Sequence, residues 1–331
     1  MIKLISPAEG YLFDTNTAVQ REFLKKTKEI GCVKTAEWLS EHKTDPERFL
    51  PARLLFVWES DQAAPYLVEI SESPDFSRAL SCFSAEKSVS LTNFKVDTQY
   101  FWRVNGSEAR SFRTKPSLLR IIDMEGVSNV RDLGGNKIKQ GLLFRGTGLA
   151  VNPFSITENG KKVFEDALGI RTEIELRKEA LPEEKCPVEG VQRFHIPYLP
   201  YGETFLEESK AGLRSLAEIF SEESNYPIYF HCWAGADRTG IIAFFLRAIA
   251  EEEDEEIHTD YEATTLLFYM KDAEDGGFSI RNREMDLYRD FLSELRKFAP
   301  DEPLRVCARR FLLSCGISEE RIEKIKSIIR K

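Results

Sequence analysis

The chain of 331 residues contains few of the side chains that most often bind metals, with four histidines and six cysteines. The cysteines lack the paired spacing of zinc or iron–sulfur sites, and His231 is the only histidine next to one of them. The sequence therefore predicts no metal, no cofactor and reduced thiols, as in a cytoplasmic protein. The six cysteines are Cys32, Cys82, Cys186, Cys232, Cys307 and Cys315.

The chain also lacks an excess of positive charge. Its formal net charge is −9 at pH 7, and no cluster of Lys and Arg stands out. Nucleic acids and anionic membranes are bound largely through basic side chains, so neither is expected as a main partner. An anionic substrate must instead be attracted by a positive electrostatic potential confined to its binding loop.

Long hydrophobic runs are missing as well. The longest, residues 241–250, is short and contains Arg247, which favours a core helix over a membrane span. Residues 1–7 lack the basic, apolar and small-residue order of a secretory signal and are typical of a first strand. We expect a cytoplasmic protein, and a secreted form whose signal has been removed is left open.

One stretch, residues 226–245, has an order that indicates chemistry. A short apolar run at 228–230 predicts a buried strand, and Thr239 and Gly240 open an apolar helix from Ile241 to about Ala250. This order directs several backbone N–H groups and a helix N-terminus at one place, where an oxyanion such as phosphate is stabilised. We expect the phosphate to be held by Trp233, Ala234, Gly235, Ala236, Thr239 and Gly240.

Side chains of the same loop supply candidates for catalysis. The helix N-terminus and Arg238 favour the thiolate of Cys232 over the thiol, which makes it a nucleophile. Arg238 presents a planar fork that can hold two phosphoryl oxygens. Asp237 can give a proton to the leaving oxygen, and His231 can orient or stabilise the thiolate.

The string His-Cys-x-x-Gly-x-Asp-Arg-Thr-Gly resembles the signature loop of the cysteine-dependent protein tyrosine phosphatase superfamily. Its Asp-Arg-Thr-Gly form is similar to the bacterial branch of atypical tyrosine/serine phosphatases, some of which also act on phosphoinositides. The resemblance covers residues 120–331 and extends to segments 129–135, 143–149 and 169–177, with Glu175 where Asp is more usual. It implies Cys232 as nucleophile, Arg238 as phosphate clamp and Asp237 as general acid.

Two departures from the family pattern bear on the chemistry. Larger tyrosine phosphatases carry the acid on a separate loop, but the corresponding segment 196–205 contains no aspartate, which favours Asp237 with Glu203 as the alternative. Many members of the bacterial branch have Lys where this chain has Ala236. The missing cation argues against a polyphosphorylated substrate.

Polar residues outside the loop have expected roles too. Asn129, Arg131 and Asp132 precede two glycines and are expected to brace the active loop by hydrogen bonds. Arg145 and Arg177 either brace the sheet or bind substrate. The acidic run 251–256 is expected to be a solvated helix end and not a metal site.

Two domains are expected. Residues 1–117 combine strand patterns at 54–58, 66–70 and 100–104 with a helical insertion at about 17–45, and they resemble a fibronectin type III β-sandwich whose partner is not predicted. A linker at 115–118 leads into residues 118–331.

The second domain alternates strand and helix patterns. This alternation predicts an α/β fold with a mostly parallel central sheet flanked by helices, the cysteine phosphatase fold, with the site at the carboxyl end of a strand. The expected strands lie at 119–122, 142–144, 172–176, 192–196 and 228–230, and the expected helices at 157–168, 204–221, 241–250, from about 260 onward, and 318–329.

We therefore predict a phosphomonoester hydrolase, a protein tyrosine phosphatase with dual specificity left open, that forms a phosphocysteine intermediate. Its substrate is a phosphorylated protein or a small phosphomonoester. Three alternatives stay open: a phosphoinositide or inositol phosphate phosphatase, a non-catalytic phosphoprotein-binding module, and a thiol oxidoreductase such as an arsenate reductase. The last needs a resolving cysteine, so Cys186 would have to lie near Cys232.

Overall fold

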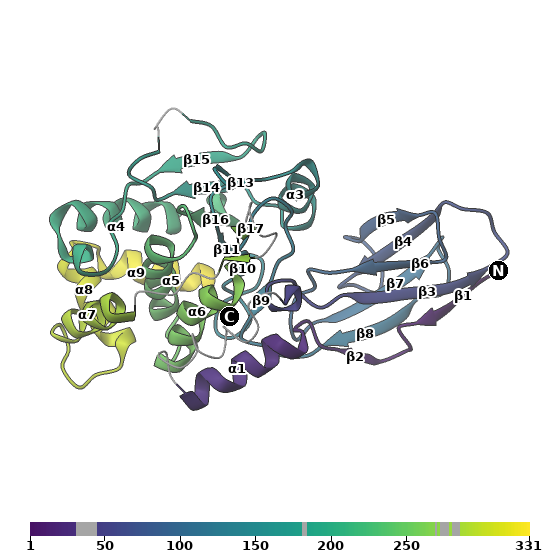
Figure 1. The fold of residues 1–331 in the computed structure, drawn as a ribbon, viewed down its shortest axis with the longest axis horizontal. Coiled ribbons are helices and arrows are strands. Elements are labelled where there is room, and N and C mark those ends of the chain that lie inside the picture. Colours follow the sequence, from purple (N-terminus) through teal and green to yellow (C-terminus); the bar gives the residue numbers. More distant parts are fainter. Residues whose placement is uncertain (31–44, 181–183, 269, 272–277, 280–284) are drawn as a thin grey trace.

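The computed structural model describes residues 1–30, 45–180, 184–268, 270–271, 278–279 and 285–331. Figure 1 shows an all-β unit, which contains the N-terminus, at one end of the molecule and a larger unit of strands and helices at the other. Residues 31–44, about half of the expected helical insertion at 17–45, lie outside the described residues. The first part of the insertion is the helix α1 (Ala18–Ile30).

The all-β unit is built from two sheets that share one core. The alternation along β7 buries Tyr100, Trp102 and Val104, which pack with Phe56 and Trp58 from the other sheet. One sheet has the order β1 (Ile2–Ser6), β3 (Leu54–Ser60), β6 (Ser88–Leu91). The other has the order β2 (Tyr11–Phe13), β8 (Arg110–Thr114), β7 (Gln99–Val104), β4 (Tyr66–Ser71), β5 (Leu80–Ser84).

The larger unit contains a six-stranded sheet with the order β15-β14-β16-β11-β10-β9. The four strands from β15 to β11 are parallel, and β10 and β9 join antiparallel at one edge. The expected strands are confirmed in this sheet, and β16 lies between two parallel neighbours. The bounds are β9 (Arg120–Ile121), β10 (Arg131–Asp132), β11 (Leu143–Gly146), β14 (Thr172–Glu175), β15 (Gln192–His195) and β16 (Ile228–His231).

Helices cover this sheet (Figure 1). They are α3 (Glu158–Lys162), which continues into a π-helical turn (Val163–Ala167), α4 (Glu207–Phe220), α5 (Asp237–Ile249), α6 (Asp254–Leu267), α7 (Met285–Arg296), α8 (Leu304–Ser314) and α9 (Glu319–Ile329). Two short antiparallel pairs complete the described strands, β12 (Ala150–Val151) with β13 (Phe154–Ser155) and β17 (Met270–Lys271) with β18 (Phe278–Ser279). Every residue of α5 from Thr239 to Ile249 is buried, as expected for an apolar helix inside a core.

The helix α5 begins four residues earlier than we expected. The Gly240 N–H donates to the Ala236 carbonyl at 2.7 Å, which already closes a helical turn. Asp237 and Arg238 therefore lie in the first turn of the helix rather than in the loop. The first turn of α5 therefore holds two of the candidate catalytic residues of the sequence motif.

The acidic run 251–256 leads from the end of α5 into the first turn of α6 and is partly solvated, as expected, but Glu252 departs from that prediction. Glu252 is fully buried and paired with the equally buried Arg247. Glu251 pairs with Lys326 and Arg330 of the C-terminal segment. Glu253 caps α6 in a reciprocal arrangement with Glu256, so this run anchors elements to one another.

The two units are joined through α1 and α6, which lie side by side in Figure 1. Val19 and Phe23 of α1 pack against Ala263, Leu266 and Leu267 of α6. The helix α6 is therefore held from the side of the all-β unit.

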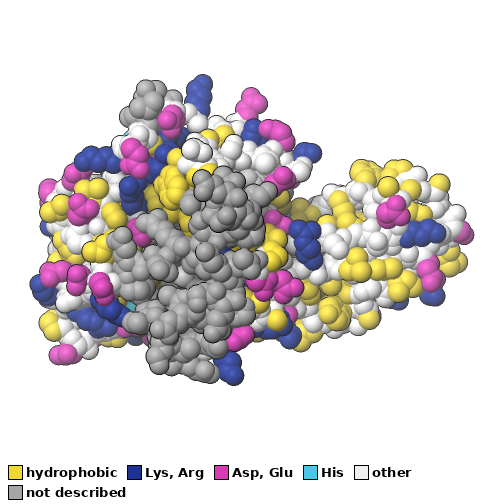
Figure 2. Space-filling view, viewed as in Figure 1, with side chains coloured by type: hydrophobic (Ala, Val, Ile, Leu, Met, Phe, Trp, Pro, Cys, Tyr) yellow, Lys and Arg dark blue, Asp and Glu magenta, His cyan; other side chains and the backbone are white. Residues whose placement is uncertain are grey.

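Among the residues that the structure describes, no helix is both long and apolar enough to cross a lipid bilayer. On the face drawn in Figure 2, the acidic and basic side chains of the coloured residues are interspersed. The coloured residues of this face therefore form no single basic patch.

Candidate active site

A cleft of about 680 Å³ opens where β16 ends and α5 begins. The sulfur-bearing Cys232, buried to 4% exposure, borders it together with Asp237 and Arg238. The three residues that the sequence singles out are thus brought to one place. The other lining residues are Leu199, Pro200, Tyr201, Gly202, Glu203, Trp233, Ala234 and Leu287.

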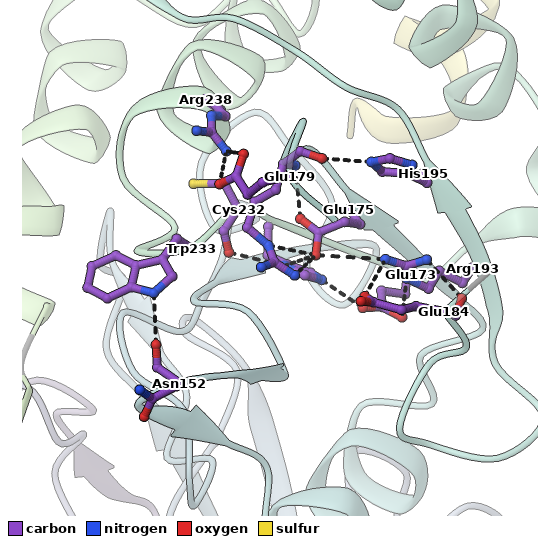
Figure 3. Close-up of polar contacts among 12 residues, drawn as sticks. Asn152, Glu173, Glu175, Glu179, Glu184, Arg193, His195, Cys232, Trp233 and Arg238 are labelled. Carbon is purple, nitrogen blue, oxygen red and sulfur yellow. Dashed lines mark hydrogen bonds and ion pairs between the residues drawn. The ribbon is translucent and has the colours of Figure 1, made fainter. Parts of the chain in front are cut away.

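Trp233 forms one wall of this cleft. Its indole N–H donates to the Asn152 carbonyl at 3.0 Å, as Figure 3 shows. Its ring packs edge-on against Phe154 and lies near Phe268. These contacts hold a large aromatic surface beside the nucleophile candidate.

The loop from Cys232 to Arg238 has the shape of an anion cradle. Gly235 adopts φ +60°, and a Cβ at this position would lie 2.0 Å from the Gly146 carbonyl oxygen, so the turn requires glycine. Within the described ranges, the N–H groups of residues 233–236 donate to no backbone carbonyl. Among the residues that the structure places, none caps α5 at Ala236 with its side chain. The helix N-terminus is therefore available to an anion.

Side chains from β11 and from the turn before β10 fix the outer side of this loop. Asn129 donates from Nδ2 to the carbonyl oxygens of Ala234 and Gly235, each at 3.0 Å. Arg145 donates to the Gly235 carbonyl at 2.8 Å. Because carbonyl groups are held on the outside, the N–H groups of the same peptides are turned toward the cleft. The bracing expected of Asn129 is present in these contacts.

Both buried arginines near the loop, Arg131 and Arg145, are held by Asp260 of α6. Arg131 Nε and Arg145 Nη1 donate to its two carboxylate oxygens at 2.7 and 2.6 Å. Burial alone would raise the pKa of Asp260, but these arginines and Arg247 hold it well below its usual range. Asp260 is therefore the anionic centre of the bracing network, and sequence reasoning missed it because it lies far along the chain.

Asp132 does not contribute to this network, in contrast to our expectation. Its carboxylate accepts from Arg120 and from the N–H groups of Gly134 and Gly141. It shapes the turn after β10 instead. The reason is the alternation of a strand, which turns Asp132 to the opposite face from Arg131.

His231 contacts carboxylates and a backbone group rather than the sulfur of Cys232. Nε2 lies 2.7 Å from Glu173 Oε1, and Nδ1 lies 3.2 Å from the Cys232 carbonyl oxygen. Burial would lower the pKa of His231, but Glu175 and Glu173 outweigh it, and the pKa is raised. The ring thus fixes the backbone that carries the cysteine.

Arg238 is held in the structure by a carboxylate. Its Nη1 donates to Glu179 Oε1 at 3.1 Å, as drawn in Figure 3. Arg177 does not reach the cleft, because it grips Glu175 through Nε and Nη2 at 3.0 and 2.7 Å. Of the two roles left open for Arg177, its contacts agree with bracing.

Asp237 has a partner that the sequence did not indicate. The Tyr201 hydroxyl donates to Asp237 Oδ1, and it also lies 2.7 Å from the Tyr261 hydroxyl. Tyr201 opens a 3₁₀ helix (Tyr201–Phe205) that also contains Glu203. Glu203 is exposed on the same cleft. Sequence reasoning missed Tyr201 because a tyrosine in this segment belongs to no catalytic motif.

Cys186 lies in a different environment from Cys232. It packs against the buried cluster that contains Val188 and does not line the cleft. Burial and the charge of Glu173 raise the pKa of its thiol. This environment gives no support to a resolving cysteine. Within the described ranges, no group of His, Cys, Asp and Glu side chains is arranged to hold a metal ion.

A family described as the tyrosine phosphatase family matches residues 122–329 of the chain. Among solved structures, the chain is 15% identical, with a TM-score of 0.32, to the core catalytic domain of the PP-IP phosphatase SIW14 from S. cerevisiae in complex with citrate; the match covers 49% of this chain and 94% of that one. A second structure of the Siw14 catalytic core is 16% identical, with a TM-score of 0.30, covering 47% and 84%. No curated protein matches the chain.

Proposed function

Because this chain belongs to the tyrosine phosphatase family and is a hydrolase of that type, we propose that it cleaves phosphotyrosine through a phosphocysteine intermediate. The observation that carries the proposal is the meeting of Cys232, Asp237 and Arg238 around one cleft, at the end of a central strand and the start of a buried helix. A thiolate, a proton donor and a guanidinium are the three groups that such a transfer needs.

In the first step the Cys232 sulfur uses a lone pair to form a bond to phosphorus. The bond from phosphorus to the phenolic oxygen breaks, and that oxygen takes a proton from Asp237 as it leaves. Arg238 and the N–H groups of the loop bind the remaining phosphoryl oxygens, which keeps the phosphorus in line with the sulfur.

In the second step a water oxygen attacks the phosphorus of the phosphocysteine. Asp237, now a carboxylate, takes the proton from the water, and the sulfur recovers its electron pair as the S–P bond breaks. Inorganic phosphate leaves, and both Cys232 and Asp237 return to their starting forms. The cycle needs one water molecule and no oxidant or reductant.

The lining of the cleft supports an aryl phosphate as the substrate. Leu199, Tyr201, Trp233 and Leu287 offer apolar and aromatic surface for a phenyl ring. Of the described lining residues, Arg238 is the one cation, and Ala236 stands where a lysine would add a second. Substrates with several phosphates are bound mainly by clustered positive charge, so a single phosphate on an aromatic ring fits better.

We also propose the finer assignments that follow from the resemblance. Residues 118–331 form the phosphatase domain, of the bacterial branch, and the Asp-Arg-Thr-Gly form of the loop supports that branch. Residues 1–117 form a fibronectin type III-like domain, which the two sheets around a common core support. Its packing through α1 onto α6 supports a role in positioning the phosphatase domain.

A substrate panel tests the proposed function. The purified full chain is assayed, with a chelator present, on matched peptides carrying phosphotyrosine, phosphoserine or phosphothreonine, and on a phosphoinositide and an inositol polyphosphate. We expect the highest kcat/KM with phosphotyrosine and no phosphate release by Cys232→Ser, which still binds vanadate.

The other outcomes would contradict the proposal in distinct ways. A higher kcat/KM with the inositol substrates would identify the protein as a phosphoinositide or inositol phosphate phosphatase. No hydrolysis of any substrate, with tight binding of a phosphopeptide, would favour the non-catalytic module. Appreciable turnover by Cys232→Ser would remove this residue from the chemistry.

A further inference from the structure

We propose that Tyr201 is a positioning residue for the acid step: its hydroxyl holds the Asp237 carboxyl toward the leaving oxygen and stabilises the negative charge that Asp237 gains when it gives up its proton. The inference rests on the proposed function, because it assigns a partner to the same acid. It concerns a residue outside the signature loop, contributed by the segment between β15 and α4.

The contacts form a short chain of polar groups that ends at the cleft. The Tyr201 hydroxyl donates to Asp237 Oδ1, and the Tyr261 hydroxyl lies 2.7 Å from the Tyr201 oxygen. A hydroxyl has one proton to donate, so Tyr201 gives its proton to the carboxylate and accepts from Tyr261. Both tyrosines are almost completely buried, at 5% and 1% exposure, which strengthens these bonds.

The surroundings hold this chain in place. The ring of Tyr261 stacks on Tyr288 of α7, with ring centroids 3.6 Å apart and planes at 9°. Tyr261 also follows Asp260 directly on α6, so one turn of this helix serves both the loop bracing and the tyrosine pair. The phenol that reaches Asp237 is thus fixed from a rigid element.

The backbone of Tyr201 supports a functional reason for its placement. It adopts φ +57°, in the left-handed region that bulky side chains rarely occupy. Such a conformation persists only when the surroundings determine it, and it is often found at functional sites. Here it directs the side chain of the first 3₁₀ residue inward, toward Asp237 and Tyr261.

The proton balance explains why the contact matters for one step in particular. When the P–O bond breaks, the Asp237 proton moves to the leaving oxygen, and Asp237 becomes an anion inside the protein. A hydroxyl that already points at this carboxyl stabilises the anion without reorganisation. Leaving groups that depart readily without a proton gain little from this help, whereas poor leaving groups depend on it.

The test compares Tyr201→Phe with the matched control Tyr198→Phe in the full chain. Tyr198 is a fully buried tyrosine of the same segment whose hydroxyl donates to Thr204 Oγ1 at 3.0 Å and not to Asp237. For each variant kcat/KM is measured over a series of aryl phosphates that runs from good to poor leaving groups. This constant reports the steps up to cleavage of the P–O bond.

We expect Tyr201→Phe to lower kcat/KM about tenfold for the poorest leaving group and less than about twofold for the best, the scale of one hydrogen bond to a charged group. Tyr261→Phe should change the dependence on leaving group in the same direction but less. Tyr198→Phe should leave the dependence unchanged. Adding Tyr201→Phe to Asp237→Asn should cause no further loss, because the two residues act as a unit.

Two results would overturn the inference and are distinguishable from each other. If the wild-type protein cleaves aryl phosphates and Tyr201→Phe lowers all of them equally, as a loss of stability would, the positioning role is wrong and the proposed function stands. If the wild-type protein cleaves none of the series, the proposed function fails and the inference fails with it. Vanadate binding, measured for every variant, establishes that the cradle is folded.

Discussion

The carboxylate of Glu179 forms an ion pair with the guanidinium of Arg238, with 3.1 Å between Oε1 and Nη1. The side chain of Glu179 is 56% exposed and that of Arg238 25%, so the pair is open to solvent. A carboxylate presents two oxygens to the guanidinium much as a phosphoryl group does. Both carboxylate oxygens contact Nη1, so a phosphate that binds this nitrogen must displace Glu179, and Glu179 competes with the substrate for it.

The first prediction follows from this competition. Glu179→Gln should strengthen inhibition by inorganic phosphate and by vanadate about two- to fivefold, the range of a partly exposed ion pair. Glu203→Gln is the matched control, because it removes the same charge from the described lining of the cleft. If both variants strengthen binding equally, the effect is one of net charge and not of competition for Arg238.

Arg238→Lys tests whether phosphate binding needs the planar guanidinium of Arg238 in addition to its positive charge. Lysine keeps the positive charge but cannot hold two oxygens in a plane. We expect kcat to fall about a hundredfold, the scale for loss of a donor to the transition state, and vanadate binding to weaken. Arg177→Lys, beside the same site but paired with Glu175, should keep most of the activity. Unchanged vanadate affinity in Arg238→Lys would contradict the clamp role.

The identity of the acid is tested by Asp237→Asn against Glu203→Gln. Asn cannot give a proton, so Asp237→Asn should lower kcat/KM by about a hundredfold or more for poor leaving groups and far less for good ones. Glu203→Gln should leave kcat/KM unchanged for both poor and good leaving groups. The opposite result, with the dependence on leaving group altered in Glu203→Gln alone, would move the acid from the start of α5 to the 3₁₀ helix.

The active loop was predictable because its parts are contiguous. Strand, loop and helix follow one another within residues 226–245, and each has its own local pattern. The start of α5 was misplaced by four residues, because the apolar pattern starts at Ile241 while the helix starts at Asp237. Local pattern does not register polar residues in a first helical turn.

The residues that support the active loop from other elements were not predictable, because only the tertiary fold brings them next to it. Asp260 and Tyr261 lie on a helix with no motif of its own, yet they reach Arg145 and Tyr201. The short strands β5 and β6 were also missed. In β5 the apolar residues Leu80 and Phe83 are exposed, so no alternation marks it.

His231 predicts a pH dependence of stability. Its pKa in the folded protein is raised above 6.5 by Glu175 and Glu173 despite burial. A raised folded pKa stabilises the protein fully below pH 6.5, and this contribution is lost as the pH rises through the folded value. We expect the free energy of unfolding to decrease across that window and His231→Gln to remove this decrease. Urea unfolding at a series of pH values measures it.

His258 supplies a control of opposite sign. Burial lowers its pKa below 6.5, and its ring lies 2.9 Å from the Tyr288 hydroxyl. A lowered folded pKa stabilises the protein above pH 6.5, and the contribution is lost as the pH falls through the folded value. His258→Gln should therefore change the profile below pH 6.5 and not above it. Identical changes in both variants would contradict the assignment to His231.

Asp260→Asn should affect both stability and activity. The substitution keeps the shape of the side chain but leaves Arg131, Arg145 and Arg247 buried without their shared anion. Breaking a buried charge network in this way costs about 3–5 kcal/mol of the free energy of unfolding. The loop should also loosen, because Arg145 holds the Gly235 carbonyl only while its own position is fixed. The KM for an aryl phosphate should therefore rise.

Asp254→Asn is the matched control. Asp254 is a partly exposed carboxylate at the start of the same helix, so its substitution should cost about 1 kcal/mol or less and leave KM unchanged. A normal KM in a destabilised Asp260→Asn would mean that the cradle keeps its shape without this anion.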